Sequence, residues 1–155
     1  MRGMVAGIVA AGVWAAAEPA LGRVFGIPWY SDRRLLGGLA RVGPEAAIAI
    51  HLVNGALFGE TFQRLGLRGP ASGVVMAQAE SFSLWPAMAV VDRVHEDRRS
   101  GNWPPLLRNG RVFAYEVTAH ALFGAVLGGL LSSTSASVPP PPPPPLLHEV
   151  QAARR

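Results

Sequence analysis

Four long runs of apolar residues alternate with charged or proline-rich stretches along the chain. The runs cover residues 3–22, 45–65, 70–91 and 111–131. Each is close to the ~20 residues that cross a bilayer as an α-helix at ~1.5 Å per residue. Because lipid offers backbone polar groups no partner, a continuous helix is the form expected for each run. The pattern therefore predicts an all-α fold, a four-span transmembrane helical bundle occupying residues 1–131.

The links between these runs differ in length and charge. The link at residues 66–69 is short enough to make the second and third helices antiparallel neighbours. The other two links are longer and hold most of the arginines, namely Arg23, Arg33, Arg34, Arg41, Arg93, Arg98, Arg99, Arg108 and Arg111. The positive-inside rule then places both long loops in the cytoplasm and both termini outside, in a multi-pass protein of the bacterial inner membrane. Trp29, Tyr30 and Trp103 in these loops are expected at the membrane interface.

The two halves of the chain also repeat one another. Residues 32–34 recur as 97–99, and residues 56–59 recur as 121–124, both at an offset of 65. Equal offsets favour a parallel duplication of a two-helix unit. The same offset pairs His51 with Glu116.

Composition strengthens the membrane interpretation. The chain is 50% hydrophobic and 15% charged, against the roughly 25% charged residues of a typical soluble domain. The lipid bilayer is therefore the first expected partner, with a second copy of the chain or another membrane protein as further candidates. Nucleic acid is not expected, because the arginines flank apolar runs instead of forming a basic face. The absence of cysteine excludes disulfides and thiolate chemistry.

Several polar side chains interrupt the apolar runs. Glu116 and His120 lie four residues apart, and Gly124 and Gly128 continue the same helix face. Small residues at this spacing let helices approach closely, so the face should point toward protein and not toward lipid. Polar groups of the other runs fall at similar depths, which predicts a polar pocket open toward the cytoplasmic half. Its candidate residues are Glu18, His51, Asn54, Glu80, Glu116 and His120.

Two other interpretations of these residues stay open. A histidine near a glutamate can simply form a hydrogen-bonded pair that fixes the register of two helices and binds no ligand. Glu18 can lie in the headgroup zone, because Pro19 can end or kink the first helix there. Glu60, Asp92 and His95 fall near the ends of the runs and are expected to be solvated.

The function hypotheses follow from this pocket. The leading one is non-enzymatic: the pocket passes protons or a small solute, or the protein supports a membrane partner. No cofactor is expected. The alternative is a redox protein that binds haem or a divalent metal through His51, Glu116 and His120, although the four-residue Glu-His spacing differs from the three-residue spacing of di-iron bundles. No phosphate-binding loop, serine elbow or paired-histidine motif points to an enzyme.

The segments "HLVNGALFGETF", "LWPAMAV" and "EVTAHALFGAVLGGLL" resemble small uncharacterised bacterial inner-membrane proteins of the YagU type. The resemblance covers residues 45–131 and implies an integral membrane protein without an established activity. Outside it lie the two ends of the chain. Residues 1–17 resemble a cleavable signal peptide, the rival interpretation being a retained first span. Residues 132–155 form a Ser/Pro-rich tail that is expected to be disordered, either as a spacer or as a ligand for a proline-reading domain.

Overall fold

The structure is a computed structural model and describes residues 1–132, which contain helices and no strand. Four helices are long: α1 (Arg2–Val24), α3 (Pro44–Arg64), α4 (Gly69–Leu84) and α7 (Gly110–Ser132). Short helices lie between them: α2 (Asp32–Ala40), the 3₁₀ turn η1 (Trp85–Ala87), α5 (Met88–Val94) and α6 (Glu96–Arg99). The predicted Ser/Pro-rich tail lies outside the described residues, apart from Ser132, which ends α7.

The third apolar run differs from its prediction, because its helix is interrupted. It ends at Leu84, passes through η1 and resumes as α5. Pro86 has no backbone N–H to donate and its ring crowds the preceding turn, so a tighter 3₁₀ turn replaces α-helix at this point. The long links also contain helices that the pattern did not predict, α2 and α6.

Three helical stretches are long and apolar enough to cross a membrane: Arg2–Val24, Gly69–Val94 and Gly110–Ser132. A fourth is counted only if α2 and α3, which meet at an angle of 108°, form one broken span. The chain therefore has the make-up of a multi-pass, all-helical membrane protein with three or four spans.

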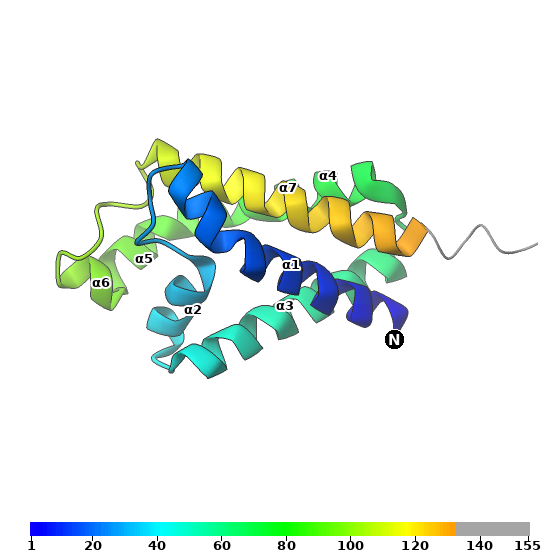
Figure 1. The fold of residues 1–155 in the computed structure, drawn as a ribbon, viewed down its shortest axis with the longest axis horizontal. Coiled ribbons are helices and arrows are strands. Elements are labelled where there is room, and N and C mark those ends of the chain that lie inside the picture. Colours follow the sequence, from blue (N-terminus) through cyan, green and yellow to red (C-terminus); the bar gives the residue numbers. More distant parts are fainter. Residues whose placement is uncertain (133–155) are drawn as a thin grey trace, which may run out of the picture.

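The long helices pack as two hairpins, α1 with α3 and α4 with α7, and the hairpins join where α1 meets α7 (Figure 1). Glycines set the distance within each hairpin. A Cβ on Gly7 would overlap the backbone of Gly55, and a Cβ on Gly73 would overlap the backbone of Gly124. The predicted seam at Gly124 thus packs against α4, and backbones approach this closely only where side chains are missing.

These glycine contacts correct the predicted pairing of the two halves. Gly55 and Gly124 occupy equivalent places, since each meets the carbonyl of an equivalent glycine, Gly7 or Gly73. The offset is therefore 69 residues between α3 and α7 and 66 between α1 and α4. His51 corresponds to His120, four residues before its glycine, and not to Glu116. The 65-residue offset, taken from the Asp-Arg-Arg and Ala-Leu-Phe-Gly repeats, places α3 and α7 one helical turn out of structural register.

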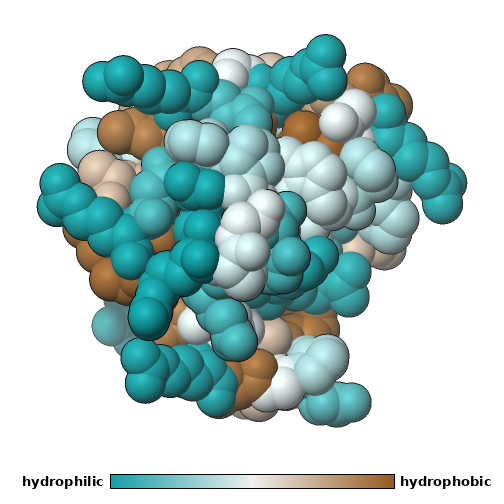
Figure 2. All heavy atoms as spheres, turned by 90° about the vertical axis from the view of Figure 1, so that its left-hand side faces the viewer, coloured by the Kyte–Doolittle hydropathy of each residue, from teal (hydrophilic) through white to brown (hydrophobic). Residues whose placement is uncertain are grey.

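The two long links gather at the end of the molecule opposite the N-terminus (Figure 1), and that end is largely hydrophilic (Figure 2). Arg34 of the first link connects it to the second link by donating two hydrogen bonds, of 2.9 and 3.0 Å, to the Asp97 carboxylate. Although burial acts in the opposite direction, hydrogen bonds from Asn102 and Arg34 hold the pKa of Asp97 below its usual range.

Four residues of this end are more buried than predicted. Tyr30 and Trp103 are 2% and 1% exposed, so they belong to the core and not to a surface belt. His95 is also buried, because its ring stacks on Trp103 at 4.4 Å. The Asp92 carboxylate is held by Arg98 at 2.8 Å and by the N–H of Leu106 at 2.7 Å. Polar partners supplied by the links thus replace the solvent that the sequence suggested.

Candidate functional site

One short segment, residues 30–33, reaches back from the link after α1 and contacts polar groups of three long helices. Its backbone turns at the start of α2, where the Ser31 hydroxyl accepts a hydrogen bond from the N–H of Arg34 and caps the helix. This turn directs the neighbouring side chains toward different helices. The 30–33 segment is therefore the partner that several of the polar residues predicted for the pocket use.

Glu18 of α1 is bound by this segment and is 2% exposed. Its carboxylate accepts from Arg33 Nε at 2.6 Å and from the backbone N–H of Asp32 at 2.9 Å. Glu18 does not line the cavity described below. Its role in the structure is to anchor the link, outside the cavity predicted for it.

His51 of α3 is buried between two hydrogen-bond acceptors. Nδ1 lies 2.8 Å from Oδ2 of Asp32, and Nε2 lies 3.1 Å from the carbonyl oxygen of Ala11. Because a carbonyl can only accept and each contact needs a proton, the ring and the Asp32 carboxyl together hold two protons. The pair is electrically neutral whichever atom carries the shared proton, so a potentially charged residue is accommodated in an apolar helix.

Glu116 of α7 accepts a hydrogen bond of 2.6 Å from the Tyr30 hydroxyl. Burial and the adjacent Glu116 carboxyl raise the pKa of Tyr30 well above its ordinary value, which keeps the phenol protonated as the donor. His120 donates from Nδ1 to the backbone carbonyl of Glu116 at 2.8 Å, while the Glu116 carboxyl oxygen is 3.5 Å away. The two side chains thus share a face as predicted, but each has a different main partner.

The indole of Trp14 packs against both histidines. Ring centroids are 5.1 Å apart for Trp14 and His51 and 4.6 Å apart for Trp14 and His120. His51 also has both nitrogens occupied. A haem held axially by both histidines needs a free nitrogen on each, and this arrangement does not provide it.

A cavity of about 240 Å³, the inner cavity, lies beside these groups between α1, α2, α3, α4, α5 and α7. Five of the six predicted pocket residues line it, all except Glu18: His51, Asn54, Glu80, Glu116 and His120. A larger and more open groove of about 1010 Å³ lies between α2 and α6, but side chains of both charge signs line it, including the paired Arg34 and Asp97. The inner cavity is the candidate functional site because it lies beside the polar groups of the long helices.

Some polar groups of the inner cavity have no partner. Within residues 1–132, the side chains of Asn54, Glu80 and Ser81 and the Nε2 atom of His120 make no hydrogen bond. We call these four the unengaged groups. Because unpaired polar groups are costly inside a membrane, they are the ones expected to meet a ligand or water.

Ser81 is one of the polar cavity residues that were not predicted from the sequence, and Asp32 is another. Ser81 lies on α4 in a four-residue series of small residues, Gly69, Gly73, Ala77 and Ser81, that parallels the small residues of α1. That series could have placed Ser81 in the interior, since small residues at this spacing mark the face of α4 that packs against protein.

Metal binding finds no support in the grouping of side chains. No cluster of three or more His, Asp or Glu residues able to hold a metal occurs in residues 1–132. Haem or a divalent metal at His51, Glu116 and His120 therefore stays an untested prediction.

Carbodiimide labelling tests the distinction between engaged and unengaged carboxyl groups. An apolar carbodiimide enters the bilayer and reacts with protonated carboxyl groups. We expect it to label Glu80 at least several-fold faster than Glu116 or Glu18, because the latter two are buried and hydrogen-bonded. Peptide mass spectrometry measures the modified fraction at each site. Equal labelling of Glu80 and Glu116 would contradict the assignment.

Comparisons with known proteins add no relative. No family model matches the chain, and neither a curated protein nor a solved structure matches it. The YagU-type resemblance therefore stays a prediction.

Proposed function

We propose that the chain is a four-span membrane protein whose inner cavity binds a small solute through its unengaged groups. In this proposal the α2–α3 pair forms the fourth span, the arginine-rich links face the cytoplasm and both termini lie outside.

The observation that carries the proposal is the contrast between two sets of polar groups. Glu18, Glu116 and the His51–Asp32 pair are satisfied by protein, so structure alone accounts for them. The unengaged groups converge on one cavity and are satisfied by nothing in residues 1–132. Because unpaired polar groups cost free energy inside a bilayer, their convergence supports a binding role.

Binding is favoured over conduction because packing closes the bundle beyond the cavity. The rings of Phe58 and Phe123, which line the cavity, pack edge to face with centroids 5.2 Å apart. A solute can enter the cavity more readily than it can cross the bundle.

Native mass spectrometry from detergent tests the proposal. Ser81→Leu should fill part of the cavity, so we expect a co-purifying small-molecule mass on the wild-type protein that is lost from this variant. Ser83→Leu is the matched control on the same helix. Ser83 is exposed, and its hydroxyl donates a hydrogen bond to the backbone carbonyl of Ala79. An adduct that survives Ser81→Leu, or a wild-type protein without any adduct, would contradict the proposal.

A further inference from the structure

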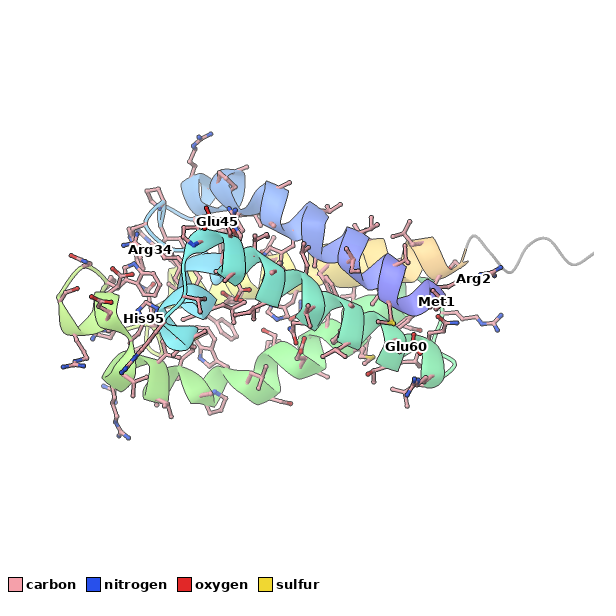
Figure 3. The ribbon with its side chains drawn as sticks, turned by 90° about the horizontal axis from the view of Figure 1, so that it is seen from below. Met1, Arg2, Arg34, Glu45, Glu60 and His95 are labelled. Atoms are coloured by element: carbon pink, nitrogen blue, oxygen red, sulfur yellow. The ribbon has the colours of Figure 1, made fainter. Side chains whose placement is uncertain are left out.

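The inner cavity is open toward the side of the bundle. The two hairpins meet through α1 and α7, whereas α3 and α4 diverge from the turn that joins them (Figure 3). Cavity-lining residues on this divergent side are exposed: Leu39 is 42% exposed and Leu84 is 58% exposed. Asn54, also exposed, lines the same cavity. In a membrane this side faces acyl chains.

The lining is divided into an apolar part and a polar part. Apolar side chains come mainly from α2, α4 and α5, and they include Leu35, Leu36, Leu39, Leu84, Met88 and Val91. Polar groups come from the 30–33 segment, α3 and α7, joined by Glu80 and Ser81 of α4. A ligand that satisfies both parts has an apolar body and a hydrogen-bonding head.

The volume of the cavity argues that part of the ligand stays outside. Sites that enclose a drug-sized molecule have volumes of about 300–1,000 Å³, and the inner cavity has about 240 Å³. It is large enough for a head and a few carbons, and a longer chain would extend between α3 and α4 into lipid.

The charges of the lining select the head. Asp32, Glu80 and Glu116 contribute carboxyl groups, while no arginine lines the cavity. An anionic head would meet carboxyl groups without a cation to offset them, and a hydroxyl or amine head can donate to Glu80, Asn54 and His120 Nε2.

We propose that the inner cavity binds the uncharged or cationic hydrogen-bonding head of a single-chain amphiphile, which enters sideways from the bilayer between α3 and α4. This inference rests on the proposed function and deepens it by naming the ligand class and the route. A long-chain alcohol or amine represents the class, and a fatty acid carboxylate or a phospholipid lies outside it.

Tryptophan quenching by brominated amphiphiles tests the inference, because Trp14 and Trp85 both line the cavity. In proteoliposomes, a brominated long-chain alcohol and amine should quench the fluorescence saturably, while the matching fatty acid at pH 8 should give only the linear quenching of bulk lipid. Trp14→Phe should remove part of the saturable quenching. Ser81→Leu should abolish it, and Ser83→Leu should retain it.

A second variant isolates the headgroup contact. Glu80→Gln should weaken binding of the amine by about tenfold or more while that of the alcohol changes little, because only the amine loses a charge-assisted hydrogen bond. Equal quenching by all three heads, or no saturable quenching because a second copy of the chain covers the opening, would overturn the inference. If saturable quenching is absent but the Ser81-dependent adduct is still found in native mass spectrometry, the ligand belongs to another chemical class. The proposed function then stands without this ligand class.

Discussion

Replacing Gly7 with alanine is expected to destabilise the protein by about 3 kcal/mol, although the change adds a single methyl group. The new Cβ would overlap the carbonyl of Gly55 and crowd Gly59, so α1 and α3 would have to separate. Both neighbours are backbone and cannot move aside as a flexible side chain can. The unfolding transition in detergent, followed by circular dichroism, measures the effect.

Gly12→Ala is the matched control on the same helix. A Cβ at Gly12 meets nothing within 4 Å, so this substitution should leave packing unchanged. Alanine favours helix over glycine by up to about 1 kcal/mol, so a small gain in stability is expected. Opposite signs for the two variants would establish the α1–α3 seam, and similar effects at both positions would argue against it.

Replacing Asp32 with alanine is expected to cost about 3–5 kcal/mol, the range for breaking a buried charge pair. His51 is 4% exposed, and its Nδ1 would lose the Asp32 carboxyl as its hydrogen-bond partner. The loss should appear as a large fall in the free energy of unfolding. The double variant Asp32→Ala with His51→Phe should recover much of it, because removing both polar partners is far less costly than removing one.

Asp97→Ala provides the comparison at the position that the sequence repeat equates with Asp32. Asp97 pairs with Arg34, whose side chain is 48% exposed. Exposed ion pairs contribute up to about 1 kcal/mol, so a small effect is expected. If Asp97→Ala lowered the free energy of unfolding as much as Asp32→Ala, the Asp32–His51 pair would not contribute more to stability than an exposed ion pair.

The helices themselves could be predicted from sequence, because runs of membrane length leave the backbone few alternatives. The interruption at Pro86 was harder to predict, because a single proline within a long apolar run does not show whether the helix breaks there. The short helix α2 is different. It depends on a cap at Ser31 and on contacts with α3, and neither produces a hydrophobic period long enough to recognise.

The polar residues were found by sequence, but their partners were not. Depth and helix face indicated that His51, Glu116 and His120 come near one another. They do line one cavity, yet the atoms that satisfy His51 and Glu116 belong to Asp32 and Tyr30. A link has no hydrophobic periodicity that would show which helices it folds back onto, so this pairing could not be predicted. The same limit hid the burial of His95 and Trp103.

The reach of the 30–33 segment has a consequence for the order in which the chain assembles during biosynthesis. Its contacts with Glu18 and His51 span 15 and 19 residues, so both can form once α1 and α3 have left the ribosome. The contact from Tyr30 to Glu116 spans 86 residues. Tyr30 therefore cannot make its contact with Glu116 until the last long helix has been synthesised. Insertion of the final helix, α7, thus completes the third of the contacts that the 30–33 segment makes with the long helices.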